Sequence, residues 1–499
     1  MMEQHGSSST YDVAAEPLLR RQDKKQDNDF YRESSLEFTI SRPPTREKYL
    51  KKLGYTPLIF RKVGSLLAAL SPMRQKKNVN FERTTEGDTF PHHQSFLPAK
   101  GSIRGSVFNL ASATLGAGAL SLPYAVAVSG IGFAIGQLLL GAALTIYTIR
   151  LLTHAAKLTK LNSYEDLALF CFGKKAAIFV ELNILVFCFG ISVAYLVTLG
   201  DILTPLGELY FGNDSILSKR WALMSFSCGV IMLPLSLLRD ISSLQFSSIL
   251  GVFSIIFLVI AVCIRSVMYS ISNGVAKSIY WGFNYSNGLQ FMLSVPIVMF
   301  AFTNQVNVFS IYTELQRPCI RRMNKVVDRA TLISFILYAT IGVVAYVAFG
   351  SSLLDKDSKG NVLLSFPLKD TLIAITRAAL TFTVSVAFPL NIFPCRFTID
   401  MMFFAYAEDS QIRHFLVTFT LVFLALLLAI FCPSINVIFG IIGGSCSAIV
   451  CFCLPAAFIL KLETGKLCGR KKIGPLVLLI SAIVIGSIST IVTVCTALV

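Results

Sequence analysis

The sequence predicts an all-α polytopic membrane protein with about eleven transmembrane helices. Of its 499 residues, 54% are hydrophobic and 14% are charged, and the mean hydropathy is +0.67, well above that of water-soluble globular proteins. Apolar runs of about 20 residues, long enough to cross the hydrocarbon, follow one another between Ile103 and Val499. A β-barrel would show alternating segments of roughly 10 residues, and this sequence does not follow that pattern.

The formal net charge of +16 does not indicate a nucleic-acid partner. In a soluble nucleic-acid-binding protein, Lys and Arg cluster on one folded domain, whereas in this sequence they lie between hydrophobic runs. The excess of Lys and Arg in loops on the cytosolic side of membrane proteins explains this distribution better. The expected surroundings are therefore the lipid bilayer.

The first 100 residues form a polar tail, and the transmembrane domain follows over residues 101–499. The tail is rich in Ser, Gln, Asp, Lys and Arg, which predicts a disordered segment on the cytosolic side. No cleavable signal peptide is expected, because the first apolar run begins only after the tail. The basic segment from Arg46 to Leu70 either rests on an anionic membrane face or is a solvated linker.

The apolar runs define eleven expected spans. They lie near residues 104 to 125, 129 to 153, 178 to 203, 221 to 238, 245 to 268, 288 to 311, 329 to 350, 371 to 392, 414 to 431, 435 to 460 and 474 to 497. With the N-terminus inside, the cytosolic breaks hold most basic residues: His154, Lys157, Lys160, Lys174, Lys175, Arg317, Arg321, Arg322, Lys325, Arg396, Arg413, Lys461, Lys466, Arg470, Lys471 and Lys472. This distribution supports that orientation.

Two further features bear on the topology. The fourth span is the weakest, because it is short and ends at Pro234 before the charged pair Arg239 and Asp240. The triplets beginning at Asn213 and Asn284 have the Asn-x-Ser pattern of glycosylation sites and fall in expected outer loops.

The chain has 12 cysteines, and most lie within apolar runs, where we expect small hydrophobic side chains rather than disulfides or metal ligands. The pair Cys451 and Cys453 is the nearest approach to a ligand pattern, and it lacks the spacing of a zinc site. The sequence also lacks a nucleophile, zinc-protease or phosphate-binding motif. An enzyme is therefore not expected.

The first span contains SATLGAGALSLPY, which combines Gly116, Gly118 and Pro123, the residue types that most weaken a helix. Within hydrocarbon, unwound backbone is tolerated only where protein or a watery cavity receives it. Free N–H groups at a half-helix N-terminus suit a carboxylate, and unwound carbonyls suit a cation or ammonium group. The alternative is close helix packing through small residues. Hydroxyls are available from Ser112, Thr114 and Ser121.

The sixth span, Ser294 to Leu315, contains Pro296 and a polar cluster without a compensating charge. Buried amides cost free energy unless they are paired, so these side chains either bond one another between helices or line a substrate site. Interrupted spans in the first and sixth positions are five apart, as expected for two inverted five-helix repeats. The cluster consists of Thr303, Asn304, Gln305 and Asn307.

Three stretches resemble the amino acid/auxin permease family. SVFNLASATLGAGALSLPYA, Ser106 to Ala125, resembles the first span of its sodium-coupled neutral amino acid transporters and its vacuolar amino acid transporters; PIVMFAF followed by IYTEL, and FPLNIFPCR from Phe388 to Arg396, resemble the sixth and eighth. The likeness covers about residues 100 to 499. It implies a LeuT-like 5+5 inverted repeat plus one extra helix.

The resemblance also implies the site residues. The carboxylate and amine of an amino acid substrate are expected at the two breaks, on Ser112, Ala113, Thr114, Gly116, Ala117, Gly118, Ala119, Phe300, Phe302, Thr303 and Asn304. A coupling ion is expected at Asn109 and at a span-eight hydroxyl, with Ser385 the best positional match and Thr383 its neighbour. Many relatives have a Cys-His pair where this chain has Asn304 and Gln305. Because neither amide titrates near neutral pH, a histidine proton relay is not expected there.

The expected function is secondary-active or facilitative transport of amino acids by alternating access. Neutral amino acids are favoured because the interrupted spans carry no central carboxylate, while arginine or lysine remains an alternative. The coupling ion is left open between Na+ and H+, with Glu181 and Asp201 in span three as the carboxylates for proton coupling unless they are merely hydrated. No other cofactor is expected.

Several properties stay open at this point. An amino acid sensor that uses the same pocket is the main alternative to a transporter. The membrane is either the plasma membrane or that of a vacuole or lysosome, with Glu16 to Leu19 as a suggestive sorting segment. The oligomeric state is not indicated.

Overall fold

The computed structural model describes residues 102–498 apart from 213, 239–244, 277–278, 285–287, 317, 356–359, 405–409, 433, 465–468 and 470. The predicted tail, with its basic segment and its Glu16 to Leu19 motif, lies outside these residues. So do Asn213 and the pair Arg239 and Asp240.

Every regular element in the described part of the chain is a helix. The α-helices are α4 (Ile103–Thr114), α5 (Leu122–Ser129), α6 (Ile131–Thr159), α7 (Tyr164–Phe172), α8 (Lys174–Phe211), α9 (Arg220–Ser227), α10 (Leu233–Ser236), α11 (Gln245–Asn273), α12 (Ser294–Ala301), α13 (Val308–Glu314), α14 (Ile320–Phe349), α15 (Thr371–Phe403), α16 (Gln411–Phe431), α17 (Ile435–Ile442), α18 (Leu454–Leu462) and α19 (Ile473–Leu498). The 3-10 segments are η1 (Ala117–Ser121), η2 (Ile216–Ser218), η5 (Gly288–Leu293), η6 (Gln305–Asn307), η7 (Gly350–Leu354) and η8 (Val362–Ser365), and η3 (Cys228–Met232) and η9 (Gly443–Cys453) are π-helical.

The prediction of an all-α polytopic membrane protein is confirmed. Among the described residues, 9 helices are long and apolar enough to cross a membrane, and the bent pair Ile103–Thr114 and Ala117–Ser129 makes a tenth span. The eleventh expected span, the fourth in order, is the helix Arg220–Ser236, which is apolar but too short to satisfy the same criterion. The number eleven is therefore not confirmed.

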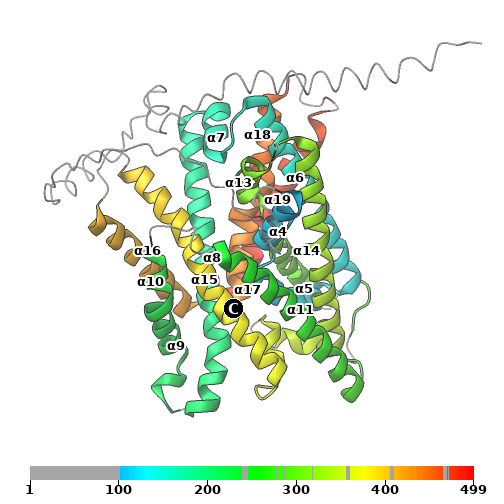
Figure 1. The fold of residues 1–499 in the computed structure, drawn as a ribbon. Coiled ribbons are helices and arrows are strands. Elements are labelled where there is room, and N and C mark those ends of the chain that lie inside the picture. The colour runs from blue at the N-terminus through cyan, green and yellow to red at the C-terminus, as the bar shows by residue number, and fades with distance from the viewer. Residues whose placement is uncertain are drawn as a thin grey trace, which may run out of the picture. The chain divides into compact units, whose positions relative to one another are not determined.

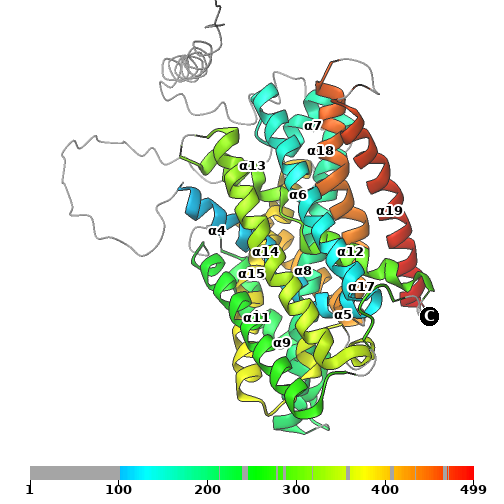
Figure 2. The same ribbon diagram turned by 90° about the vertical axis from the view of Figure 1, so that its right-hand side faces the viewer.

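The long helices run between two ends of the bundle. We call the end at which α6 finishes and α7 lies the α7 end, and the opposite end, at which α14 finishes, the η7 end (Figure 1). Helix α14 packs against α4, α6 and α11, and α15 packs against α8 and α11. Helices α18 and α19 lie side by side (Figure 2).

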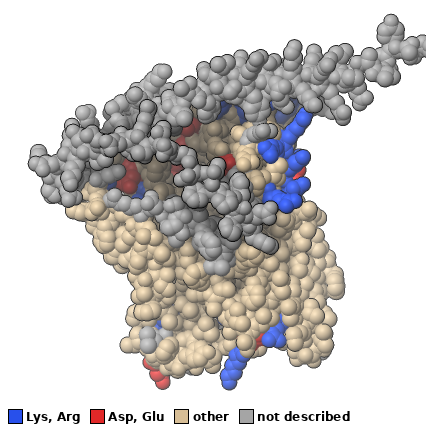
Figure 3. Space-filling view, viewed as in Figure 1, with Lys and Arg blue, Asp and Glu red and all other residues tan. Residues whose placement is uncertain are grey.

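The outer surface of the bundle is apolar. On the face shown in Figure 3, a wide band without charged residues separates the Lys, Arg, Asp and Glu residues that lie toward the two ends. The peripheral helices α16 and α19 expose large side chains, including Phe423, Leu428, Ile483 and Ile491. In water such a surface would be unfavourable, whereas lipid tails solvate it without cost.

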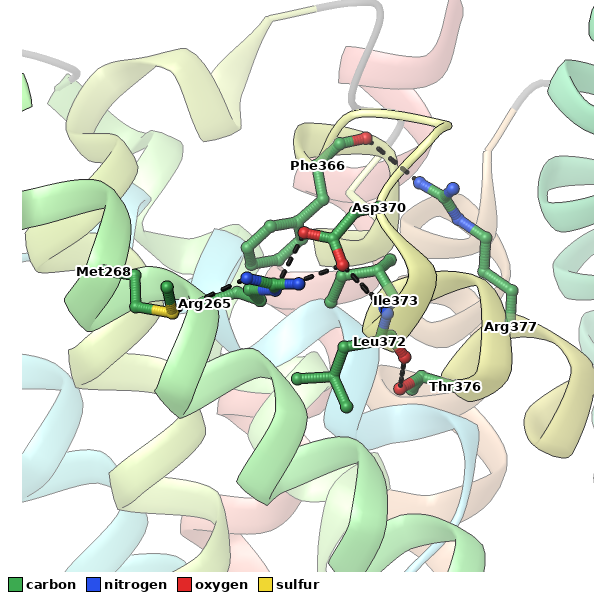
Figure 4. A network of polar contacts seen from close by, with 8 residues as sticks. All are labelled: Arg265, Met268, Phe366, Asp370, Leu372, Ile373, Thr376 and Arg377. Carbon is green, nitrogen blue, oxygen red and sulfur yellow. Dashed lines mark hydrogen bonds and ion pairs between the residues drawn. The ribbon is translucent and has the colours of Figure 1, made fainter. Parts of the chain in front are cut away.

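An outer segment, made of the described residues 350–355 and 360–366, lies at the η7 end. Its helix η7 packs on α5, and its helix η8 packs on η1. The buried guanidinium of Arg377 holds this segment, because one nitrogen, Nη2, donates to the carbonyl oxygens of Leu363 (2.7 Å) and Phe366 (3.0 Å). Beside it, Asp370 caps α15 and pairs with Arg265 at 2.8 Å (Figure 4).

The side chain of Asn284 is not accessible for glycosylation, in contrast to the expectation from its Asn-x-Ser triplet. Asn284 is 2% exposed, its Nδ2 donates to the carbonyl oxygen of Ala127 (3.1 Å), and its backbone N–H donates to that of Ser129 (2.9 Å). These bonds satisfy carbonyls at the end of α5. Asn284 itself is therefore a buried partner of the α5 C-terminus and not an exposed residue.

Candidate substrate-binding site

The first span is interrupted at Leu115 and Gly116. Both residues have extended backbone, and the two half-helices meet at a bend of 51°. Because η1 runs directly into α5, the second half begins at Ala117 and its first amide groups have no partner within the helix. Pro123 lies in the first turn of α5, where a missing N–H costs nothing, so it shapes the second half and does not cause the break.

The sixth span is interrupted at the last residue of the FAF motif, Phe302. Helix α12 ends at Ala301, Phe302 to Asn304 are not helical, and the short η6 leads into α13. Pro296 is the third residue of α12, so again the proline opens a half-helix, and the polar residues themselves occupy the break. Both predicted interruptions are therefore present, and their positions, first and sixth, agree with the LeuT-like arrangement.

The two breaks lie against each other. The Nδ2 of Asn304 donates to the hydroxyl of Thr114 at 2.7 Å, and that hydroxyl donates to the carbonyl oxygen of Leu110 at 2.8 Å. The hydroxyl of Tyr338, on α14, lies 2.6 Å from the carbonyl oxygen of Thr114 and 3.1 Å from that of Ala301. Residues about 190 positions apart in the sequence thus meet at one place.

Two of the four residues in the polar cluster of the sixth span, Asn304 and Gln305, bond to other helices. Gln305 donates from Nε2 to Thr148 of α6 at 3.2 Å, and its Oε1 accepts from the backbone N–H of Asn304 at 2.9 Å. Thr145 donates to the carbonyl oxygen of Phe302 at 3.5 Å. Gln305 therefore joins helices, one of the two roles expected for this cluster.

Asn304 differs from Gln305 in having an unused acceptor. Its side chain is 1% exposed, and its Oδ1 has no hydrogen-bond partner among the described residues. A buried amide oxygen without a donor is costly, and a ligand with an N–H group would relieve that cost. Thr303, by contrast, donates to the carbonyl oxygen of Met299 at 2.8 Å.

The glycines of the first break have different neighbours. A Cβ on Gly118 would lie 3.5 Å from both the Cα of Ala301 and the Cδ1 of Phe300, so this glycine lies in contact with α12. A Cβ on Gly116 would meet only the hydroxyl of Tyr195, at 3.9 Å. The open side of the break is therefore at Gly116 and faces α8.

The remaining expected substrate residues surround these positions. Ser112 and Ala113 are half-buried on the last turn of α4, and Ala117 and Ala119 are buried in η1. The ring of Phe300 stacks on Phe439 of α17 with centroids 4.3 Å apart, and the ring of Phe302 meets Tyr338 edge-on at 5.5 Å.

Four aromatic residues around the breaks were not anticipated from the sequence: Tyr195, Tyr338, Phe187 and Phe439. Each lies on a helix with an unbroken apolar pattern, in which Tyr and Phe are ordinary core residues. Only their position relative to a helix break distinguishes them. The sequence carries no local signal for that position.

The expected ion-binding residues differ in their exposure and in the direction in which their side chains point. Asn109 is exposed on α4. Ser385 is 3% exposed and donates to the carbonyl oxygen of Thr381 at 2.8 Å, whereas Thr383 bonds to Ser254 of α11 at 2.8 Å. Since residues two apart on a helix point in roughly opposite directions, Thr383 and Ser385 do not share one face of α15.

The carboxylates of span three are not hydrated. Glu181 is 8% exposed and Asp201 is 2% exposed. Asp201 lies 3.3 Å from Arg220 of α9, and Arg220 donates to the carbonyl oxygen of Cys432 at 2.8 Å. The expectation of simple interfacial hydration is therefore wrong for Asp201, because a buried guanidinium accompanies it.

The described histidines lie at the α7 end, as expected. The Nε2 of His154 lies 3.0 Å from Glu463, after α18, and this hydrogen bond holds the pKa of Glu463 below its usual value. His414 contacts Arg396 and the carbonyl oxygen of Leu237. In the part of the chain that the structure describes, no group of His, Cys, Asp and Glu forms a metal site.

The chain is similar to a known protein family and, more distantly, to solved structures. A solved structure described as the substrate-bound, outward-open state of a Na+-coupled sialic acid symporter is similar at 15% identity, over 78% of this chain and 87% of that chain, with a TM-score of 0.45. A family model described as transmembrane amino acid transporter protein matches residues 99–499. This match spans the whole membrane domain, and the chain therefore belongs to the transmembrane amino acid transporter family.

Proposed function

We propose that the protein is a secondary-active transporter that holds neutral amino acids between the two interrupted spans. The observation that carries this proposal is the contact between the breaks, where Asn304 meets Thr114 and leaves its own Oδ1 buried without a donor. An α-ammonium group would supply that donor. The free amide groups at the start of η1, at Ala117 and Gly118, suit the α-carboxylate.

The charge of the interrupted spans supports a neutral substrate. Residues 102–129 contain no Asp or Glu, and Glu314, at the exposed end of α13, is the one carboxylate in residues 294–315. A cationic side chain buried at the breaks would lack a countercharge, and an unpaired buried charge is strongly unfavourable. A side chain without charge avoids that cost.

Alternating access follows from the same geometry. Unwound segments in two spans allow each half-helix to tilt about the break without disturbing the hydrogen bonds of the other half. The coupling ion is Na+ or H+, and the Na+ alternative rests on Asn109 and Ser385, the residues that the family resemblance indicates. The basic residues at the α7 end indicate that this end faces the cytosol.

The experiment that tests the function is uptake into proteoliposomes. The purified full chain is offered each of the common amino acids, first with and without Na+ and then with and without a pH gradient. We expect saturable uptake of one or more neutral amino acids and little uptake of arginine, lysine, aspartate or glutamate. Preferred uptake of arginine or lysine would overturn the neutral assignment. Binding without flux for every amino acid would favour a sensor over a transporter.

A further inference from the structure

The hydroxyl group of Tyr338, on α14, lies where the two interrupted spans meet. Tyr338 is fully buried, and its hydroxyl contacts the carbonyl oxygens of Thr114 and Ala301 at 2.6 and 3.1 Å. Thr114 is the last residue of α4, and Ala301 is the last residue of α12. The hydroxyl thus lies between the C-terminal ends of two half-helices from different spans.

Two such ends do not attract each other. The carbonyl groups of a helix C-terminus carry a partial negative charge, so two of them placed together repel unless a proton or a cation lies between them. A tyrosine hydroxyl has one proton and two acceptor positions. It donates to one of these two carbonyls at a time.

Helix α14 holds the Tyr338 hydroxyl in a fixed position. It is continuous over 30 residues, and it packs on both halves of the first span. One turn after Tyr338, Gly342 lies so close to α5 that a Cβ there would be 3.0 Å from Val126. The ring of Tyr338 is itself held edge-on by Phe302.

We propose that Tyr338 is the positioning residue that joins the two breaks, its single hydroxyl proton linking the end of α4 to the end of α12. Because one hydroxyl serves two backbone carbonyls in two spans, the two breaks are ordered together or loosened together. Movement of the first span during transport then requires the hydroxyl, which keeps its proton, to donate to the carbonyl of one span and to lose its contact with the carbonyl of the other. This inference deepens the proposed function and rests on it only for the transport measurement below.

The first test measures the breaks without reference to transport. Hydrogen–deuterium exchange of the purified full chain is followed in peptides covering residues 114–119 and 301–305. In Tyr338→Phe we expect exchange in both segments to accelerate together, by about tenfold or more, since each lost hydrogen bond to a buried partner corresponds to about that factor. Acceleration in one segment alone, or in neither, would contradict the proposal.

Tyr346 provides a matched control on the same helix. It is 1% exposed, and its hydroxyl accepts a hydrogen bond from the backbone N–H of Tyr280 at 3.1 Å, away from the breaks. Tyr346→Phe likewise removes the hydroxyl oxygen of a buried tyrosine on α14, but at a place away from the breaks. We expect it to leave exchange in residues 114–119 and 301–305 unchanged.

The second test is transport by the same variants, with the best substrate from the amino acid panel. We expect Tyr338→Phe to lose at least about tenfold in uptake rate while Tyr346→Phe keeps most of its activity. If exchange accelerates in both segments of Tyr338→Phe but the parent protein transports no amino acid, the joining role stands and the proposed function fails. Normal uptake by Tyr338→Phe would show that transport does not need the hydroxyl.

A second variant covers the case in which Tyr338→Phe does not fold. Replacement of Tyr338 by 3-fluorotyrosine keeps the ring and the hydroxyl and makes the hydroxyl a stronger donor. Exchange in the two segments should then slow together. No change, or slowing in one segment alone, would contradict the proposal.

Discussion

Asn304 lies where the two interrupted spans meet, and its two amide atoms have different surroundings. Its Nδ2 is bonded to Thr114, whereas its Oδ1 is buried without a donor. The neighbouring Gln305 has the same functional group, but its two amide atoms are bonded, to Thr148 and to the backbone N–H of Asn304. The unused acceptor therefore makes Asn304 a candidate ligand contact, whereas Gln305 joins helices.

Substitutions of increasing size at Gly118 test the contact between η1 and α12. A Cβ at Gly118 would make ordinary van der Waals contact with Ala301 and Phe300, so Gly118→Ala should transport nearly normally. The further atoms of Gly118→Leu have no room, and overpacking of this kind costs about 1–3 kcal/mol, which forces η1 away from α12. We expect Gly118→Leu to reduce uptake to about a tenth or less.

The control for Gly118 is Gly136 on α6, where an added Cβ would meet nothing within 4 Å. Gly136→Leu should match the parent protein in both surface expression and uptake. Full activity of Gly118→Leu, at equal expression, would show that the contact between η1 and α12 is not required.

The elements differ in how their interruptions arise. The broken spans lose their helical hydrogen bonds at Gly116 and at the polar residues Thr303 and Asn304, while the prolines nearby open the following or preceding half-helix. In the tenth span the helix does not break but widens into the π-helical η9, where a Cβ on Gly443 would approach the carbonyl oxygen of Pro296. Only a glycine permits this close approach to α12.

Arg377 gives a prediction for the outer segment. Removing its two hydrogen bonds in Arg377→Met should free residues 362–366, because a charged donor contributes about 1.5–3 kcal/mol. We expect hydrogen exchange in these residues to accelerate by roughly tenfold or more. Overall stability should change little, since a buried charge is removed as well.

The control for Arg377 is Arg329→Met on α14, an exposed position of the same residue type. It should leave exchange in residues 362–366 unchanged. If Arg377→Met also leaves that exchange unchanged, the packing of η8 on η1 holds the segment without the guanidinium.

The whole molecule is held by contacts between helices that are distant in sequence. Asp201 and Arg220 join α8 to α9, and the carbonyl oxygen of Cys432 extends this link to the end of α16. The side chain of Asp201 is 0% exposed and that of Arg220 is 20% exposed. The hydrogen bond from Arg220 to Cys432 therefore ties this early part of the bundle to a late one.

Asp201→Asn should destabilise the molecule strongly. Breaking a buried pair leaves an uncompensated charge and costs about 3–5 kcal/mol, or somewhat less here because Arg220 keeps some solvent contact. We expect the apparent unfolding temperature in detergent to fall by several degrees. The double variant Asp201→Leu with Arg220→Met should recover part of that loss, since no charge remains unpaired.

An exposed pair provides the comparison for Asp201. Asp328 and Arg150 are 2.8 Å apart, with side chains nearly half exposed, and such pairs contribute about 0–1 kcal/mol. Asp328→Asn should leave the unfolding temperature almost unchanged. An equal shift in Asp201→Asn and Asp328→Asn would mean that burial does not strengthen the dependence on Asp201.

The sequence alone predicted the helical membrane architecture, the two interrupted spans and the polar residues within them. Those properties follow from apolar run length and from residue types that weaken a helix, and both are local. It indicated that the fourth span is short, but it did not predict that Asn284 is buried or that Asp201 is paired, because each of these depends on a partner elsewhere in the chain.

The sequence by itself determined where the helices break, since Gly116 and the Thr303 to Asn304 segment cannot sustain regular hydrogen bonding in hydrocarbon. Only the tertiary structure decided that Gly116 is the open side of the site and that Gly118 contacts α12. It also decided that Tyr338 reaches both breaks and that Asn304 keeps a free acceptor. The physical reason is that a helix break is a local event, whereas the partner of a buried polar atom is set by how distant helices pack.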